Sequence, residues 1–488
     1  MQKEMDIYKN RWAIMATVML LTFMSVLDSN IVNVTLPVMS KELSVSTAQI
    51  GWVVTSYLIT IVGLILVFGR LADIQGKTRI FKIGVVIFTL GSLLCGISHS
   101  LIMLAISRVI QAIGAAATMA TNQGIITQVF PAHERGKALG LNGTFVALGA
   151  MIGPSLGGFI ADKFSWEYIF LINVPIGILA FILALKNLPS STKNSTESLD
   201  VKGAILFGLS VISLFGAVVQ GQEVGYGNPL IISGFILAVI TFILFIILER
   251  KIKEPLLHLE IFENKLFSLS VFCAFLSFIA ISTSNIILPF YLQDVIKLSP
   301  TYTGLVMMFS PLILAVVAPL SGYLSDKIGS EVLTLIGLLV TSIGLALMIT
   351  LSQYSSIVLL VVFIGVTTLG NAMFQSPNNS LIMSTVPKHK LGIAGSINGL
   401  VRNLGMTAGV SLSTTLLYSM MSQKVGYHVS GSINGREDIF MYGMKWVYAS
   451  AAIVCAFGAI LTAYRLYRAK NGERAQKRFG GDDSLVKS

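Results

Sequence analysis

The sequence has little charge. Of its 488 residues only 12% are Asp, Glu, Lys or Arg, whereas a soluble protein carries about a quarter. It is also poor in cysteine and histidine. All three cysteines lie in apolar stretches, which excludes a disulfide framework. The five histidines have no metal-ligand spacing, so neither a metal site nor an enzyme active site is predicted.

The sequence is instead rich in long apolar runs. Hydrophobic residues make up 54% of the chain, and runs of about 20 apolar residues, each long enough to cross a bilayer as a helix, recur along its length. The sequence therefore predicts an all-α polytopic membrane protein. Its fourteen expected spans are 12–36, 50–69, 80–98, 101–122, 138–161, 166–186, 202–221, 229–249, 266–291, 301–323, 332–352, 355–377, 391–420 and 443–466.

The basic residues predict the orientation. With the N-terminus inside, 26 of the 34 Lys and Arg fall on cytoplasmic segments and 6 on outer loops, and Arg108 and Arg402 lie within spans. This bias places both termini in the cytoplasm. It explains the pI near 9.4 without a nucleic-acid partner. The first apolar run lacks a small-residue cleavage site, so we expect a retained span and not a signal peptide.

Two sequence blocks recur. GRLADIQGKTRIFKIG (69–84) aligns with 322–337 at an offset of 253, and PAHERGKALGLNGTFVALGAMIG (131–153) aligns with 387–409 at an offset of 256. Spans one to six therefore map onto spans nine to fourteen in the same orientation, as in transporters whose halves rock around a central site. The expected organisation is a cytoplasmic N-terminus (1–11), a six-helix half (12–187), a linker (188–201), an inserted helix pair (202–249), a linker (250–265), a second half (266–468) and a basic cytoplasmic tail (469–488).

Four motifs resemble those of one family. The stretches LDSNIVNVTLP (27–37), GRLADIQGKTR (69–79), RVIQAIGAA (108–116) and LGAMIGPSLGG (148–158) are similar to motifs of the major facilitator superfamily, in its fourteen-span drug:proton antiporter branch. The resemblance covers Trp12 to about Arg468. GKT at 76–78 does not form an ATP-binding loop, because Leu71 stands where that loop needs glycine.

The resemblance implies a conformational role for two of these motifs. In the loop after span two, glycines permit a tight turn and close helix approach, and Asp73 can cap a helix or pair with Arg79. Ile74 replaces a residue that is usually basic. In span five, glycines clear one helix face and a proline bends the helix. The expected conformational residues are Gly69, Arg70, Asp73, Gly76, Lys77, Arg79, Gly149, Gly153, Pro154, Gly157 and Gly158.

Asp28 and Arg108 are the candidates for proton coupling. A carboxylate in an apolar span is desolvated, which favours the neutral form that a proton carrier must also adopt. The alignment places its counterpart at Ser282 or Thr283, and that of Arg108 at Ile364, so the second half has neither charge. Direct binding of a cationic substrate and a structural hydrogen bond remain open for Asp28, and structural ion pairing for Arg108.

The resemblance further implies a central cavity lined by spans one, four, nine and twelve. The candidate substrate-binding residues are Asn33, Tyr57, Gln111, Asn122, Asn285, Met307, Asn371, Gln375, Asn378 and Arg402. Arg402 has no family motif. It could pair with an acid in the cavity, bind an anionic group, or sense the arrangement of the halves.

The expected function is proton-coupled export, by antiport, of small lipophilic and cationic compounds across a bacterial cytoplasmic membrane. The expected partners are the substrate, protons and the lipid bilayer. The expected protein is a monomer without a cofactor, driven by the proton gradient. Two intramembrane arginines leave an alternative open, namely transport of an anionic metabolite, a lipid or a peptide-like substrate.

Overall fold

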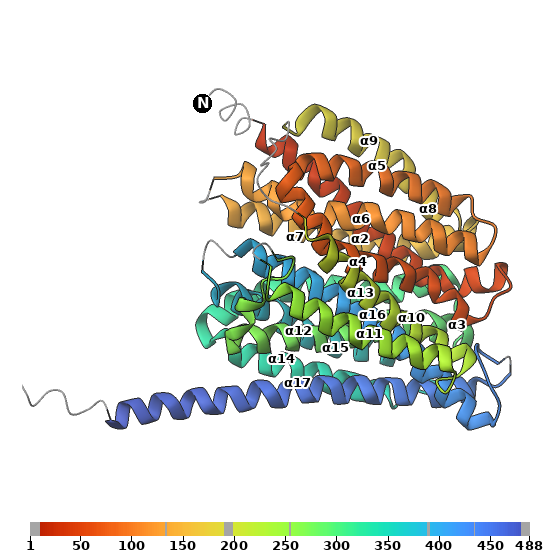
Figure 1. The fold of residues 1–488 in the computed structure, drawn as a ribbon. Coiled ribbons are helices and arrows are strands. Elements are labelled where there is room, and N and C mark those ends of the chain that lie inside the picture. The colour runs from red at the N-terminus through yellow and green to blue at the C-terminus, as the bar shows by residue number, and fades with distance from the viewer. Residues whose placement is uncertain are drawn as a thin grey trace, which may run out of the picture.

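The computed structural model describes residues 10–131, 134–189, 199–252, 255–387, 391–433 and 435–479, and this part of the chain is helical without a strand (Figure 1). The predicted N-terminus (1–11), linkers and tail lie partly or wholly outside the described residues. The all-α prediction is confirmed.

Each predicted span lies, to within a few residues at its ends, in one helix or in two consecutive ones. The first half contains α2 (Arg11–Glu42), α3 (Thr47–Ile50), α4 (Trp52–Gln75), α5 (Lys77–Gly96), α6 (Leu101–Val129), α7 (Arg135–Lys163), α8 (Tyr168–Leu171) and α9 (Asn173–Asn187). Next come α10 (Val201–Val224), α11 (Pro229–Glu249) and η1 (Leu259–Glu263). The second half contains α12 (Lys265–Phe290), η2 (Tyr291–Val295), α13 (Pro300–Ile328), α14 (Ser330–Met348), α15 (Ile357–Ser384), α16 (Leu391–Val425) and α17 (Glu437–Phe479).

Among the described residues, thirteen helical segments are long and apolar enough to cross a membrane. The other long helix is α16, which carries Arg402 and several polar residues and does not reach that hydropathy. It packs within the bundle, since Gly405 and Gly409 lie against α12. The fourteen predicted spans are thus accounted for by thirteen apolar segments and one more polar helix.

The helices run along a common direction, and the two described termini lie at the same end of the bundle, the left end in Figure 1. We call this the inner end, because the charge distribution predicts that it faces the cytoplasm, and the opposite end the outer end. Helices of the first half occupy the upper part of the view and those of the second half the lower part.

The predicted repeat is visible in matching glycine contacts between neighbouring helices of the two halves. A Cβ added to Gly84 of α5 would lie 2.9 Å from the carbonyl oxygen of Gly114, and one added to Gly337 of α14 would lie 2.8 Å from that of Gly370. These pairs are related by the offsets of 253 and 256 found in the sequence. Both loops between the corresponding helices also turn at a glycine with a φ of +94°, the left-handed region that glycine tolerates.

The first span follows a different offset. A Cβ on Gly149 would lie 2.8 Å from the carbonyl oxygen of Phe23, and one on Gly405 would lie 2.8 Å from that of Phe275. The offset is therefore 252, and the counterpart of Asp28 is Ala280, not Ser282 or Thr283. The sequence alignment missed this because its matching blocks begin after the first span, beyond a loop whose length differs between the halves.

The inserted helices bridge the two halves. Gln222 of α10 donates a hydrogen bond to Thr414 of α16 at 3.3 Å. Nearer its beginning, α10 meets the first half, since a Cβ on Gly63 of α4 would lie 3.8 Å from the Cα of Gly208 of α10. Helix α10 therefore contacts one helix from each half, while α11 packs on α10, where Ser210 donates to the carbonyl oxygen of Ala238 at 3.0 Å.

Candidate functional site

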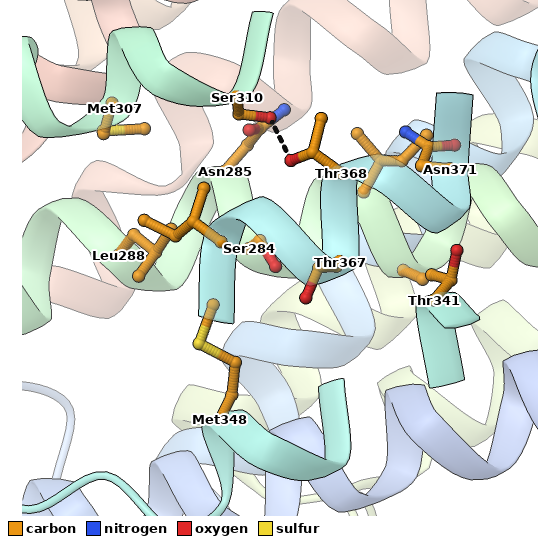
Figure 2. Close-up of a pocket in the computed structure, with 13 residues that line it drawn as sticks. Ser284, Asn285, Leu288, Met307, Ser310, Thr341, Met348, Thr367, Thr368 and Asn371 are labelled. Carbon is orange, nitrogen blue, oxygen red and sulfur yellow. Dashed lines mark hydrogen bonds between the residues drawn. The ribbon is translucent and has the colours of Figure 1, made fainter. Parts of the chain in front are cut away.

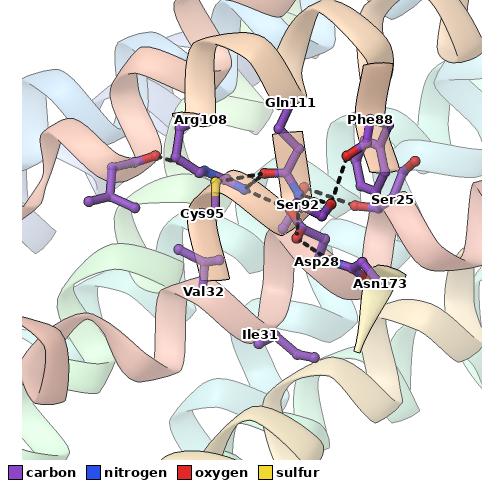
Figure 3. A network of polar contacts seen from close by, with 12 residues as sticks. Ser25, Asp28, Ile31, Val32, Phe88, Ser92, Cys95, Arg108, Gln111 and Asn173 are labelled. Atoms are coloured by element: carbon purple, nitrogen blue, oxygen red, sulfur yellow. Dashed lines mark hydrogen bonds and ion pairs between the residues drawn. The ribbon is translucent and has the colours of Figure 1, made fainter. Parts of the chain in front are cut away.

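A buried polar network surrounds Asp28 (Figure 3). Arg108 Nη1 lies 2.7 Å from Asp28 Oδ2. Asp28 Oδ1 accepts hydrogen bonds from Gln111 Nε2 at 2.9 Å and from Asn173 Nδ2 at 2.7 Å. Gln111 also donates to Ser92 at 2.8 Å. The network thereby ties together α2, α5, α6 and α9, the helices of the first half that carry these side chains.

The guanidinium of Arg108 is enclosed on all sides. It donates to Gln111 Oε1 at 2.5 Å and to the carbonyl oxygen of Val53 at 3.1 Å. Its Cζ lies 4.0 Å from the centre of the Tyr57 ring and 5.6 Å from that of Phe170. Only 1% of Arg108 and none of Asp28 is exposed. An ion pair so completely desolvated depends on its partners, because neither charge has water to replace the other.

The geometry of the network suits an ionised Asp28. Its oxygens accept three donors, one of them cationic, whereas a protonated carboxyl would need an acceptor for its own hydrogen. Gln111 Oε1 already accepts from Arg108, and Asn173 presents its Nδ2, not its Oδ1, to the carboxylate. Proton uptake at Asp28 therefore requires at least one of these side chains to move.

Asn173 and Ser92 belong to the network but were not predicted as site residues. Asn173 begins α9 after a short turn and is fully buried, as is Ser92 in α5. A polar residue inside an apolar run was the available signal for both. That signal is weak, because many serines and threonines in this chain donate only to their own helix, as Thr89 does to Val85.

A second polar feature is a cavity of about 40 Å³ inside the second half (Figure 2). It has room for about three water molecules and is too small for a drug-sized compound, whose pockets measure about 300–1,000 Å³. None of the described residues that line it is ionisable. They are Ala280, Ile281, Ser284, Asn285, Leu288, Met307, Ser310, Thr341, Met348, Ile364, Thr367, Thr368 and Asn371.

Three of the predicted substrate-binding residues, Asn285, Met307 and Asn371, line this cavity. Two others, Tyr57 and Gln111, lie in the Asp28 network. Of the rest, Asn122 donates to Thr22. Asn378 donates to the carbonyl oxygen of Ser270 at 3.0 Å, Gln375 donates to Asn371 at 3.4 Å, and Asn33 is half-buried in α2.

Arg402 lies deep in the protein, on the N-terminal part of α16. Its side chain is partly exposed. Among the described residues, no hydrogen-bond or ion-pair partner accompanies it. It contrasts with Arg108, which has a carboxylate, an amide and a carbonyl oxygen around it. A guanidinium at this depth without a carboxylate partner is costly to keep, and its partial exposure leaves it accessible to a solute.

The loop motif pairs Asp73 with Lys77. Their side chains lie 3.4 Å apart, four residues from each other in the sequence and on either side of the α4–α5 connection. The Lys77 stem packs over Gly124 of α6, where a Cβ would lie 2.8 Å from Lys77 Cδ. The expected close approach at Gly69 is wrong, because a Cβ there would meet nothing within 4 Å. The expected tight turn is present at Gly76, which has a φ of +94°.

The glycines of α7 serve two contacts. Gly149, Gly153 and Gly157 lie one turn apart and face the backbone of α2 within the first half. Gly158 instead faces α13 of the second half, where an added Cβ would overlap the carbonyl oxygen of Pro300, and Gly304 faces Pro154 in the same way. The small-residue face therefore joins α7 both to its own half and to the other half.

The outer end is closed by contacts between the halves. Thr301 donates to Asp162 at 2.8 Å, and Gln293 donates to the carbonyl oxygen of Val34 at 2.8 Å. Lys41 lies 3.1 Å from Asp294. The loop before α17 joins this closure, because the carbonyl oxygen of Ser430 accepts from the amide of Ala48 at 2.9 Å. A solute could reach the interior from this side only after these contacts separate.

Solved structures with the same fold are transporters. The chain matches a bacterial homologue of the human lysosomal transporter Spinster, in an inward-facing and occupied conformation, with a TM-score of 0.64, 16% identity, and coverage of 92% of this chain and 96% of that one. It matches the peptide transporter POT in complex with sulfate with a TM-score of 0.65, 16% identity, and coverage of 92% and 94%. At this identity the likeness shows the fold alone.

Curated relatives are more similar in sequence. The riboflavin transporter RibZ of Clostridioides difficile (strain 630) is 35% identical over 93% of this chain and 98% of its own length. Multidrug resistance protein Stp of Mycobacterium tuberculosis (strain H37Rv) is 32% identical over 84% and 76%. Multidrug resistance protein 3 of Bacillus subtilis (strain 168) is 30% identical over 86% and 85%. Residues 18–410 and 270–487 match the Major Facilitator Superfamily, and with these relatives and this fold the chain belongs to that family of membrane transporters.

Proposed function

We propose that this protein is a proton-driven antiporter that exports small lipophilic compounds by alternating access. The observation that carries the proposal is the buried Asp28 carboxylate, held by Arg108, Gln111 and Asn173 in a half whose repeat has no charge at the corresponding positions. Because the second half folds without these charges, we attribute Asp28 and Arg108 to proton coupling and not to folding. Relatives named multidrug resistance proteins support the export of lipophilic compounds.

The coupling follows from the hydrogen bonds. Proton binding at Asp28 neutralises the partner of Arg108 and removes an acceptor from Asn173 or Gln111. Arg108 then loses its anionic partner and can move away from Asp28, and where Asn173 is the donor that loses its acceptor, the hydrogen bond between α9 and α2 is broken. Because α2 also packs against α7, which touches the other half, this rearrangement reaches the contacts that close the outer end. Deprotonation toward the cytoplasm restores the pair.

The names of the relatives indicate two classes of substrate. The relatives include both multidrug resistance proteins and a riboflavin transporter, so compounds of different charge are candidates. A cationic substrate, as expected from the sequence-based resemblance, and a neutral one such as riboflavin are both compatible with a lipophilic interior. The cytoplasmic membrane of a bacterium is the expected location.

The test is transport in proteoliposomes. Purified protein is reconstituted, a pH gradient is imposed, and movement of ethidium and riboflavin is followed by fluorescence. Wild-type protein should move at least one of them against its concentration gradient only while the pH gradient persists. Asp28→Asn, which keeps the shape of the side chain, should lose this accumulation, whereas the exposed carboxylate variant Asp438→Asn should keep it.

Normal gradient-driven accumulation by Asp28→Asn would refute the assignment of the proton carrier. Transport by wild-type protein that ignores the pH gradient would refute proton coupling. Thermal unfolding of each variant distinguishes loss of coupling from loss of folded protein.

One observation favours a second candidate, the export of anionic compounds. Arg402 has no carboxylate partner among the described residues and is partly exposed, so an anionic group could bind it. An organic anion such as fluorescein then becomes the transported probe, and Arg402→Gln should lower its transport while leaving that of ethidium unchanged. Equal transport of fluorescein by both forms would dismiss this candidate.

A further inference from the structure

The cavity of the second half stands where the Asp28 network stands in the first half. At the offset of 252, Asp28 corresponds to Ala280, and at 256, Arg108 and Gln111 correspond to Ile364 and Thr367. All three counterparts line the cavity. The other pairs, at 252 or 253, are Val32 with Ser284, Tyr57 with Ser310, Phe88 with Thr341, and Cys95 with Met348.

Side-chain size explains why one half is filled and the other is hollow. In the first half the Tyr57 ring stacks over Arg108, and Gln111 occupies the space beside Asp28. In the second half these positions carry Ser310, Ile364 and Thr367. Shorter side chains on the same backbone scaffold leave the volume unoccupied, and hydroxyl groups remain on its wall (Figure 2).

The wall of the cavity offers hydrogen bonds that the protein does not use. The Asn285 side chain has no hydrogen-bond partner among the described residues. Asn371 Oδ1 accepts from Ser277 at 3.3 Å, whereas no described residue accepts from the amide nitrogen of Asn371. The hydroxyls of Ser310 and Thr368 lie 2.9 Å apart and face the same space (Figure 2). Asn371 is buried and Asn285 is half-buried. Buried polar groups normally have partners, so an occupant with donors and acceptors fits.

We propose that this cavity binds an uncharged hydrogen-bonding group of the substrate, such as an amide, imide or hydroxyl, while the apolar remainder of the substrate lies in the space between the halves. The proposal rests on the export function proposed above and specifies the group that the second half recognises. The two copies of the repeat thereby have different tasks. The first carries the charges for proton coupling, and the second carries an uncharged recognition site.

The absence of charged residues among the described residues of the cavity wall determines which chemical class of substrate group can bind there. A cation or anion entering the cavity would lose its hydration and find only hydroxyls and amides, because none of the described lining residues is ionisable. Desolvating an unpaired charge costs far more than such neutral partners return. An uncharged group loses less and gains the unused hydrogen bonds of Asn285 and Asn371. Leu288, Met307 and Ile364 supply the apolar wall against which a ring can pack.

A matched pair of fluorescent probes tests this. Phenanthridinone carries an uncharged lactam on a three-ring system, and ethidium carries a cationic ring nitrogen on a similar system. Binding of each to purified protein in detergent is measured by fluorescence without a pH gradient. The result is therefore independent of proton coupling, and failure of the transport mechanism is distinguishable from failure of the cavity assignment.

Two cavity variants probe size and charge. Thr367→Gln introduces the side chain of the corresponding first-half residue and should fill the cavity. Asn371→Asp keeps the acceptor that Ser277 uses and adds a negative charge. Each variant should raise the dissociation constant of phenanthridinone about tenfold. This change corresponds to the loss of one or two hydrogen bonds. Asn371→Asp should also strengthen ethidium binding. Asn379→Asp, two turns along α15 at an exposed position, is the matched control and should change neither affinity.

Selective loss of phenanthridinone binding in both variants, with the control unchanged and all three proteins equally resistant to thermal unfolding, supports the proposal. It is overturned if wild-type protein does not bind phenanthridinone, if Thr367→Gln binds it normally, or if ethidium binding falls in parallel in both variants. Each of these results would mean that the cavity holds solvent alone or serves only packing.

Discussion

The ion pair between Asp28 and Arg108 makes a quantitative prediction, because the second half shows what the scaffold tolerates without it. Ala280 and Ile364 stand at the corresponding positions. Replacing one partner alone, by Asp28→Ala or Arg108→Ile, leaves the other charge with at most 1% exposure. Breaking a buried pair in this way costs about 3–5 kcal/mol. Replacing both removes the orphaned charge as well as the attraction.

The double variant should therefore lose much less than the sum of the single losses. It still leaves Gln111 and Asn173 without their carboxylate acceptor, at about 1–3 kcal/mol each. With single losses near 4 kcal/mol, we expect the double loss to be about 5 kcal/mol and the coupling energy about 3 kcal/mol. The assay is equilibrium unfolding of purified protein in detergent micelles, with the denaturing detergent SDS as the variable.

Additive losses, within about 0.5 kcal/mol, would refute the reasoning, because they would mean that the two side chains stabilise the fold independently. The same cycle on Arg436 and Asp438, whose side chains are 56% and 53% exposed, is the control and should show a coupling energy below about 1 kcal/mol. The double variant that remains folded should not transport against a pH gradient, which distinguishes a coupling role of the pair from a purely structural one.

Further predictions concern the contacts around the site. Gly158→Ala places a methyl group onto a backbone carbonyl of α13, so ethidium efflux should fall sharply while thermal unfolding changes little. Gly76→Ala forces alanine into a φ of +94° and should cost about 1–3 kcal/mol in SDS unfolding, whereas Gly69→Ala in open helical space should be neutral or stabilising by about 0.5–1 kcal/mol. Lys41→Ala should cost about 1 kcal/mol in unfolding, because Lys41 is 68% exposed and Asp294, which is only 9% exposed, keeps its hydrogen bond from Ser432.

Much of the fold followed from the sequence. Apolar runs are long because each span must satisfy its backbone hydrogen bonds within the bilayer, so hydropathy alone located the spans. The repeat was visible in two loops because the glycines that make those turns and helix contacts, such as Gly76 and Gly84, admit few substitutes. The helix limits were less predictable, since α2 continues past the apolar run to Glu42 and α13 to Ile328.

The site was predictable only in part. Asp28 and Arg108 stood out because charges inside spans are rare, and the structure brings them together at 2.7 Å. The sequence left open whether they act as a pair. Asn173 could not be foreseen as the third partner of Asp28, because 145 residues separate them and polar residues in spans are common. Tyr57 and Gln111 were predicted to bind substrate but lie in the network, since family analogy gives the helices of a cavity and not the direction of each side chain.

The cavity of the second half shows a further limit. Its polar residues, such as Ser310 and Thr367, are unremarkable in sequence and become informative only beside their larger first-half counterparts. That comparison needs the offset of 252 for the first span, which glycine contacts fix and the loop alignment does not. The predicted counterparts Ser282 and Thr283 imply offsets of 254 and 255, which lie between the offsets of the two loop blocks, and therefore miss Ala280.

The most direct test of the account is substrate-induced proton release. Purified protein in weakly buffered detergent solution is mixed with saturating ethidium or riboflavin, and pH is recorded with an indicator dye. Wild-type protein should release protons on binding at least one probe, and Asp28→Asn should bind that probe without releasing any. Undiminished proton release from Asp28→Asn would contradict the claim that this carboxylate carries the coupled proton.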